Sequence, residues 1–232
     1  MFETSAPRIP DDRVLRIDNS LPPFSADLTS EVERFCDRIE DAVDMGAVLV
    51  RVGSSMPTPD HASVGVRQVK KWEGALRRLE RSPALTVAVA EQNCTGPAFE
   101  ALLVCDYRIA RPCTEFALPI VGGTPWPGTA IHRLATQVGA ANVRRTVLFG
   151  TPLTASAAGR IGLVDTVTDD VDAALTELWS WSGSLAGSEV AVRRRLLLEA
   201  SSTGFDESLG THLSACDRTL RRATRDQEPV AP

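Results

Sequence analysis

The chain lacks a long hydrophobic run. None of its 232 residues lies in an apolar stretch approaching the ~18 residues that a membrane-spanning helix needs. The first residues, "MFETSAPRIPDD", are polar and contain no apolar segment of the kind found in secretory signal peptides. We therefore expect a cytoplasmic protein that does not associate with a membrane.

Metal-ligating residues are also scarce. The five cysteines form no C-x-x-C pair, and the three histidines, His61, His132 and His212, are scattered along the chain. This pattern argues against a zinc site, and we expect no bound metal. The cysteines fit the reduced thiols of a cytosolic protein.

An excess of positive charge is missing too. The 25 basic and 30 acidic residues give a formal net charge of -5, which argues against a protein that binds nucleic acid. At 43% hydrophobic residues the chain can bury a sizeable core. No repeat or linker divides it, so we expect one domain over residues 13–225, with disordered ends at 1–12 and 226–232.

Strand and helix patterns alternate in the first half of the chain. Apolar residues at helical spacing predict helices over 25–43 and 66–82, the second ending before Pro83. Short apolar runs predict strands over 13–18, 46–52, 84–90 and 107–110. The residues expected on the buried helix faces are Leu28, Val32, Phe35, Ile39, Val43, Val69, Trp72, Leu76 and Leu79.

The second half is mostly helical. After a strand-like piece at 115–119 and a loop rich in glycine and proline at 120–128, helices are expected at 129–139, 140–150 and 154–162. A short strand over 163–168 and three closing helices complete the chain. The whole pattern predicts an α/β domain with a helical C-terminal part.

One short apolar helix carries an acid. It follows a break at Gly96-Pro97 and contains Glu100. Both residues have a structural explanation, because proline suits the first helical position and an acid in the first turn suits the helix dipole. The functional alternative is a carboxyl group in an apolar pocket whose pKa is raised by burial and which transfers protons.

Several phrases resemble the crotonase (enoyl-CoA hydratase/isomerase) superfamily. They are "ALTVAVAEQNCTGPAFEALLVCDYRIA", "FALP" and "TAIHRLATQVGAANVRRTVLFGTPLTASAAGRIGLVDTV". The resemblance covers roughly residues 13–205. It implies the crotonase-like ββα superhelix with a helical C-terminal part, and a CoA thioester as substrate with no separate cofactor.

The resemblance also implies an oxyanion hole made of two backbone N–H groups. One position matches Ala62, and the other falls on Pro97, which has no N–H. Either a neighbouring donor such as the Ala98 N–H serves instead, or the hole is broken. His61, beside the first position, is either an acid/base group or plain surface.

Of the two glutamates that hydratases of this superfamily use, the chain keeps one. Glu100 matches the first, whereas Ile120 stands at the position of the second. Hydration of a double bond by the usual route is therefore disfavoured, and Glu100 is left to act alone as a proton shuttle. Trp126, in the loop that follows, either lines the pocket or caps the core.

A narrower resemblance points to the crotonase-like proteins of 3,5-dihydroxyphenylglycine biosynthesis in producers of glycopeptide antibiotics. It is carried by "KKWEGALRRLERSPALTVAVA", "CDYRIARP", "WPGTAIHRLA", "RRTVLFGTPL" and "HLSACDRTLRRA". It implies a helper of a type III polyketide synthase that makes 3,5-dihydroxyphenylacetyl-CoA from malonyl-CoA. The helper would promote dehydration and aromatisation of the CoA-bound polyketide. The alternative is a non-catalytic partner that binds the synthase and stimulates it.

The same resemblance implies further partners. A second crotonase-like protein belongs to that pathway, and the superfamily assembles through its C-terminal helices. Residues 205–223 are amphipathic, so we expect a homo-oligomer, with dimer and trimer both open. Basic runs such as "RRR" at 193–195 either meet the phosphates of CoA or are solvated helix faces.

Overall fold

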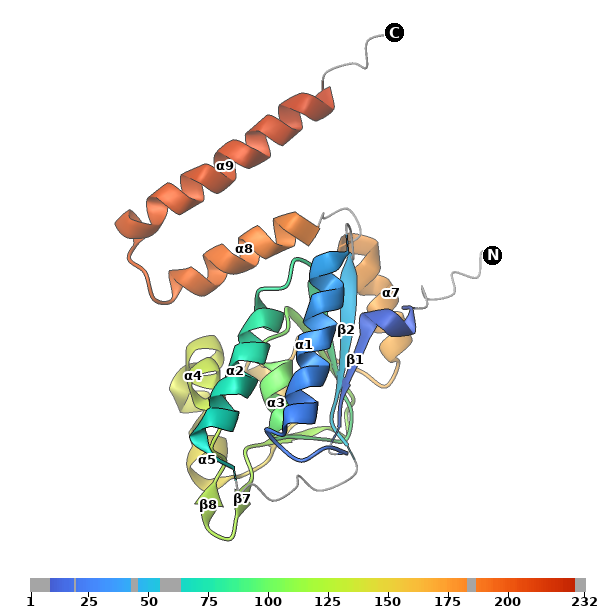
Figure 1. Ribbon diagram of the computed structural model, residues 1–232, viewed down its shortest axis with the longest axis vertical. Coiled ribbons are helices and arrows are strands. Elements are labelled where there is room, and N and C mark those ends of the chain that lie inside the picture. The colour runs from blue at the N-terminus through green and yellow to red at the C-terminus, as the bar shows by residue number, and fades with distance from the viewer. Residues whose placement is uncertain (1–8, 19, 43–45, 55–63, 183–186, 228–232) are drawn as a thin grey trace.

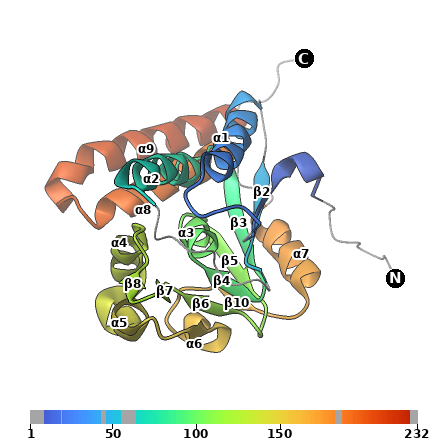
Figure 2. The ribbon, with the colours of Figure 1, turned by 60° about the horizontal axis from the view of Figure 1, so that its bottom comes forward.

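The computed structural model describes residues 9–18, 20–42, 46–54, 64–182 and 187–227. Its centre is a parallel sheet in the strand order β1-β2-β3-β5-β10, of which Figure 2 labels β2, β3, β5 and β10. The strands are β1 (Val14–Ile17), β2 (Ala47–Val52), β3 (Leu85–Ala90), β5 (Tyr107–Ala110) and β10 (Thr166–Val167). The four strands predicted in the first half of the chain are thereby confirmed.

Both faces of this sheet are covered, which explains why its inner strands are apolar without interruption. Along β3, Val87 and Val89 belong to one hydrophobic cluster, and Ala88 and Ala90 belong to the other. This alternation is the two-residue period of a strand. The sheet therefore separates a larger core from a smaller one.

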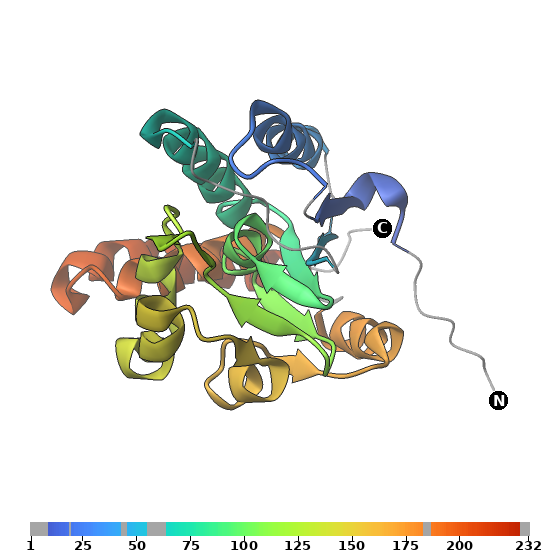
Figure 3. The same cartoon turned by 90° about the horizontal axis from the view of Figure 1, so that it is seen from below.

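Helices α1 (Ala26–Asp41) and α2 (Val66–Glu80) pack over the larger core, and α7 (Val171–Ser182) packs over the smaller one, as Figure 3 shows. The hydroxyl of Ser25 caps α1 by accepting from the Leu28 N–H at 3.2 Å. The predicted apolar faces are confirmed for Leu28, Val32, Phe35, Ile39, Trp72, Leu76 and Leu79, which are buried, and Val69, which is half-buried. Val43 lies outside the described residues.

A second layer continues from the end of β3. It holds a three-stranded sheet of β4 (Asn93–Thr95), β6 (Glu115–Ala117) and β9 (Leu153–Thr154), and a hairpin of β7 (Ile120–Val121) and β8 (Thr124–Pro125). Helix α3 (Pro97–Leu102) follows β4 and packs on strands of both sheets, as Figure 2 shows. The loop predicted over 120–128 therefore includes a short hairpin.

The next helices largely follow the prediction. They are α4 (Ala130–Leu134), a π-helical segment (Ala135–Gly139), α5 (Ala140–Phe149) and α6 (Ala155–Arg160). The strand predicted over 163–168 is shorter than expected. The N–H groups of Leu163 and Val164 donate to the Ala158 carbonyl and so close the end of α6, which leaves only β10 to pair.

The chain closes with α8 (Gly187–Ala200) and α9 (Phe205–Gln227). Figure 1 shows α9 standing away from the sheet, with α8 between them. Apolar side chains of α9 are open to solvent: Phe205 is 75%, Leu213 58% and Leu220 68% exposed. The α/β architecture with a helical C-terminal part is confirmed. None of the helices in the described part of the chain is long and apolar enough to cross a membrane.

One buried ion pair fastens α8 to the core. The guanidinium of Arg194, 8% exposed, donates to both carboxylate oxygens of Asp106 at 2.5 and 2.6 Å. It also donates to the carbonyls of Ser82 and Ala84, just ahead of β3. The interpretation of "RRR" as a solvated face is thus wrong for its middle residue, whereas Arg193 and Arg195 are exposed.

Candidate active site

Glu100 lies in a helix that the backbone builds around a glycine. Gly96 precedes α3 with φ 56° and ψ -125°, a backbone conformation that residues with a Cβ atom rarely adopt. Pro97 then occupies the first helical position, and the Glu100 N–H donates to the Gly96 carbonyl at 3.0 Å. Every residue of α3 is buried, so Glu100 reaches the interior at the start of a helix with no solvent-facing side.

The Glu100 carboxylate is enclosed by N–H donors from two other segments. Its Oε2 accepts from the Trp72 indole of α2 at 2.9 Å. Its Oε1 accepts from the backbone N–H groups of Thr129 at 2.7 Å and Ala130 at 3.2 Å. The side chain is 0% exposed, so these protein groups replace water around it.

Burial and hydrogen bonding act on Glu100 in opposite directions. Burial raises the pKa of Glu100 to about 7, against the lowering effect of the bonds from Trp72, Thr129, Trp126 and Ala130. A carboxyl group with this pKa exchanges its proton near neutral pH. That property suits a general acid or base.

The segment over Glu100 depends on a second glycine. A Cβ atom at Gly128 would clash with Oε1 of Glu100 and with the Trp126 indole nitrogen. Trp126 itself is 6% exposed and stacks on Phe24, with ring centroids 4.8 Å apart. Gly128 therefore lets residues 126–130 come close enough for their N–H groups to reach the carboxylate.

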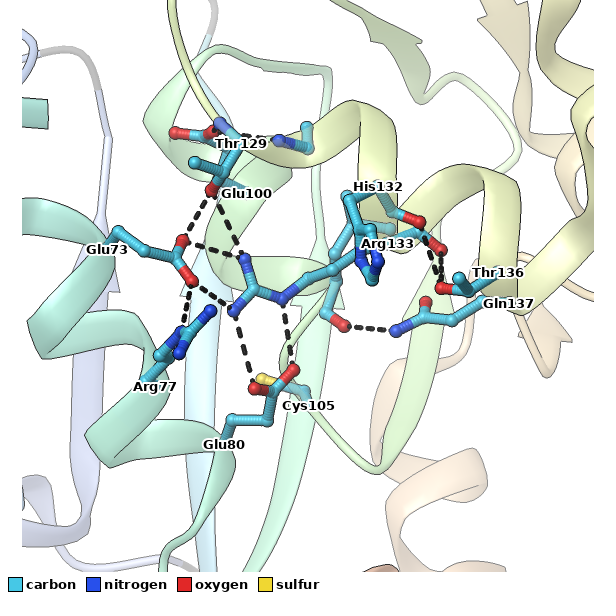
Figure 4. Close-up of polar contacts among 12 residues, drawn as sticks. Glu73, Arg77, Glu80, Glu100, Cys105, Thr129, His132, Arg133, Thr136 and Gln137 are labelled. Carbon is cyan, nitrogen blue, oxygen red and sulfur yellow. Dashed lines mark hydrogen bonds and ion pairs between the residues drawn. The ribbon is translucent and has the colours of Figure 1, made fainter. Parts of the chain in front are cut away.

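A charged network lies beside this carboxylate, as Figure 4 shows. Arg133 of α4 grips Glu73 of α2 with both terminal nitrogens, each at 2.9 Å, and its Nε donates to Glu80 at 3.0 Å. Glu73 also accepts from Arg77 at 2.9 Å and from the Thr129 hydroxyl. With 9% of its side chain exposed, Arg133 needs these two carboxylates to compensate its charge.

The hydrogen bonds keep Glu73 ionised. Burial alone would raise the pKa of Glu73, but the bonds from Arg133, Thr129 and Arg77 outweigh it and lower the pKa to about 2. Two glutamates from neighbouring helices therefore differ in ionisation. Glu73 is a carboxylate at neutral pH, whereas the raised pKa of Glu100 brings its titration close to neutral pH.

The remaining predicted site residues are spread over several places. Pro97 is buried and Ala98 follows it in the first turn of α3, where a backbone N–H has no acceptor in its own helix. Ile120 is 44% exposed on β7, and its side chain lies near Gly150. Ala62 and His61 lie outside the described residues. The pairing of the two oxyanion positions stays a prediction.

Sequence reasoning missed four residues of the site, two that bond to Glu100 and two that bond to the Thr129 hydroxyl. They are Trp72, Glu73, Thr129 and Arg133. A usable signal was the seven-residue spacing of Glu73 and Glu80, which puts two acids on one edge of the apolar stripe of α2. Two acids so placed beside a buried face call for a cation, and Arg133 supplies it.

Across residues 9–18, 20–42, 46–54, 64–182 and 187–227, no group of three or more histidine, cysteine, aspartate or glutamate side chains is arranged to hold a metal ion.

Residues 61–230 match the family model described as enoyl-CoA hydratase/isomerase. The chain belongs to the enoyl-CoA hydratase/isomerase family. It is 44% identical over 209 residues to a protein named "Enoyl-CoA-hydratase" from Amycolatopsis orientalis, a match that covers 90% of this chain and 96% of that one. It is also 26% identical over 137 residues to a methylmalonyl-CoA decarboxylase of Escherichia coli, covering 56% and 52% of the two chains.

Comparison with solved structures confirms the crotonase-like fold. An enoyl-CoA hydratase from Polaromonas sp. superposes with a TM-score of 0.76 at 18% identity, covering 91% of this chain and 90% of that one. Pseudomonas aeruginosa DspI superposes with a TM-score of 0.74 at 19% identity, covering 90% and 92%. These chains thus share the backbone fold with this protein although their sequences differ at most positions.

Proposed function

We propose that this member of the family acts on a CoA-bound polyketide and promotes its dehydration and aromatisation, as a helper of a type III polyketide synthase. The product would be 3,5-dihydroxyphenylacetyl-CoA made from malonyl-CoA, on the pattern of DpgB in glycopeptide-antibiotic biosynthesis. The observation that carries the proposal is a single buried carboxyl group, Glu100, whose pKa is raised to about 7.

One carboxyl group suffices for this chemistry. In its ionised form Glu100 takes a proton from a carbon next to the thioester carbonyl, and the electron pair expels a hydroxyl group. The same proton, passed back from Glu100, leaves with that hydroxyl as water. Dehydration is driven forward by aromatisation, so no second acid is needed, in keeping with Ile120 at the other position.

The thioester oxygen needs N–H donors that do not change during the reaction. Pro97 cannot supply one, so the role falls to the Ala98 N–H at the start of α3. CoA enters as part of the substrate, with no separate cofactor. The synthase and a second crotonase-like protein are the proposed partners, and the chain is proposed to act in the cytoplasm as a homo-oligomer.

The second candidate is a non-catalytic partner that binds the synthase and stimulates it. The closure of Glu100 favours it, because both carboxylate oxygens already accept from Trp72, Thr129 and Ala130. The Glu100 side chain is 0% exposed, so a neighbouring segment would have to move to admit a substrate. A carboxylate that only caps α4 would need no such movement.

The test is reconstitution of a cognate type III synthase with malonyl-CoA, with this protein or its Glu100→Gln variant added at several ratios. The proposal predicts more 3,5-dihydroxyphenylacetyl-CoA and less shunt lactone with the natural chain. It predicts a ~10²–10⁴-fold smaller stimulation with Glu100→Gln, the range that a positioned acid or base contributes. Full stimulation by Glu100→Gln would favour the non-catalytic partner, and an unchanged product profile with the natural chain would overturn both candidates.

A further inference from the structure

We propose that Glu73 is a positioning residue: held by Arg133, it anchors the Thr129 hydroxyl and thereby keeps the Thr129 and Ala130 N–H groups on the carboxylate of Glu100. The catalytic meaning of this network rests on the proposed function, whereas the network itself can be tested without any activity.

Thr129 bonds to both glutamates. Its backbone N–H donates to Glu100 at 2.7 Å, and its hydroxyl donates to Glu73. A rotation of Thr129 that broke one bond would displace the other, because both start from one residue. The positions of the two carboxylates are therefore coupled.

The coupling replaces an ordinary helix cap. Thr129 is the N-cap residue of α4, and a threonine there usually turns its hydroxyl to accept from an N–H of the first turn. Here the Thr129 side chain makes no such cap. Glu100 accepts from the first helical N–H, that of Ala130, in its place. The hydroxyl instead donates to Glu73 and accepts from Arg133 at 3.4 Å.

Arg133 makes Glu73 a fixed anchor. Two parallel bonds of 2.9 Å hold both oxygens of Glu73, an arrangement that restricts rotation as a single bond would not. The Nε of Arg133 also donates to Glu80 at 3.0 Å, and Arg133 lies only four residues after Thr129 in the chain. The anchor and the residue it orients are therefore joined by one turn of helix as well as by hydrogen bonds.

The charged groups near Glu100 make it possible to distinguish positioning of Thr129 by Glu73 from a direct effect of the Glu73 charge on Glu100. Charged groups approach from α2 (Glu73, Arg77 and Glu80) and from α4 (Arg133, with His132 exposed), and the cysteines Cys94 and Cys105 are buried nearby in the core. None of these charges is among the chief influences on the Glu100 pKa, which are burial and N–H donors.

The direction in which the pKa of Glu100 changes when Glu73 is replaced therefore distinguishes the two roles. If Glu73 acted on Glu100 only as a negative charge, its removal would lower the pKa of Glu100. If it positions Thr129, its removal loosens two N–H bonds to the carboxylate and raises that pKa.

The experiment follows the infrared C=O band of the protonated Glu100 carboxyl as a function of pH, with the band assigned by its absence in Glu100→Gln. Glu73→Gln and Thr129→Ala should each raise the pKa of Glu100 by about one unit, because the two N–H bonds to its charged form are weakened. Thr129→Ser, which keeps the hydroxyl, should restore the natural value. Combining Glu73→Gln with Thr129→Ala should give little more than either alone.

Glu80→Gln is the matched control. Glu80 and Glu73 both bind Arg133 and have the same side-chain exposure of 16%, but only Glu73 touches Thr129. Glu80→Gln should shift the Glu100 pKa far less than Glu73→Gln. A lowered pKa in Glu73→Gln, or an unchanged one in Thr129→Ala, would overturn the proposal. If Glu73→Gln does not fold, the comparison of Thr129→Ala with Thr129→Ser decides alone.

The outcome is distinguishable from failure of the proposed function. The infrared titration uses the protein by itself, so a raised pKa supports the network even if no synthase is stimulated. Conversely, a stimulation lost in Glu100→Gln but untouched in Glu73→Gln and Thr129→Ala would keep the proposed function and remove the positioning role.

Discussion

The indole N–H of Trp72 donates to Oε2 of Glu100 at 2.9 Å, which joins the middle of α2 to the first turn of α3 across 28 residues of sequence. Trp72 is 1% exposed, so this bond lies where water cannot replace it. The tryptophan therefore has a polar role in addition to its place in the apolar stripe of α2.

Replacing Trp72 by phenylalanine tests that role. Trp72→Phe removes the N–H but keeps an aromatic ring, so the ionised form of Glu100 loses one donor and its pKa should rise above about 7. Stability should fall by ~1–3 kcal/mol at pH 8, the cost of leaving a buried acceptor unpaired, and by less at pH 5. Urea unfolding at the two pH values measures the difference. Equal losses at both would show that only packing was removed.

The raised pKa of Glu100 makes stability depend on pH. Its pKa is about 7 in the folded chain against an ordinary 4.5, so the folded state binds the proton more tightly than the unfolded one. The resulting stabilisation is fully present below pH 4.5 and is lost as pH rises through 7, a change on the order of 3 kcal/mol. Glu100→Gln should flatten this slope in a series of denaturant titrations, because the amide does not titrate.

Glu73 acts in the opposite direction at lower pH. Its pKa of about 2 lies below the ordinary 4.5, so its contribution is present above pH 4.5 and lost as pH falls toward 2. The titrations should therefore be compared between Glu100→Gln and Glu73→Gln. Only Glu73→Gln should reduce the acid sensitivity below pH 4.5.

The attachment of α8 can be tested with two neighbouring arginines. Arg194→Met leaves the half-buried Asp106 without its partner, and loss of one member of a buried pair costs ~3–5 kcal/mol. Arg195→Met is the control, because that side chain is 70% exposed and pairs with Glu199, so its loss should cost ~0–1 kcal/mol. Hydrogen exchange of α8 should accelerate in the first variant alone. Similar losses in both would contradict a fastening role for Arg194.

Hydration of crotonyl-CoA should be slow. Ile120 stands where the resemblance places the second glutamate, and it is 44% exposed on β7. Loss of the enoyl absorbance measures the reaction directly. Turnover near the ~10 s⁻¹ median of enzymes would refute the single-carboxyl interpretation.

The fold was predictable where one period describes a whole element. The apolar spacing of α1 and α2 and the uninterrupted strands β2 and β3 follow from burial on one helix face or on both sheet faces. The start of the strand predicted over 163–168 was wrong because Leu163 and Val164 bond to α6, and periodicity does not show which of two partners a backbone N–H will choose.

The candidate site was predictable only in part. Glu100 drew attention as a lone acid in an apolar helix, but the donors that surround it come from positions 72, 129 and 130. Such contacts depend on how helices cross, which a pattern along one helix does not determine. Arg193, Arg194 and Arg195 illustrate the same limit, since adjacent and identical residues have opposite environments.

The position of α9, away from the sheet, affects where a protease should cut the chain. Its chief packing partner among the described elements is α8, and the turn at residues 201–204 separates the two. A helix so weakly tied to the core opens and closes many times for each global unfolding, so a protease should cut within or before it while the sheet stays intact. If a second copy covers Phe205, Leu213 and Leu220, dilution should quicken that cut. The rate of this single cleavage, compared between dilute and concentrated samples, then measures self-association.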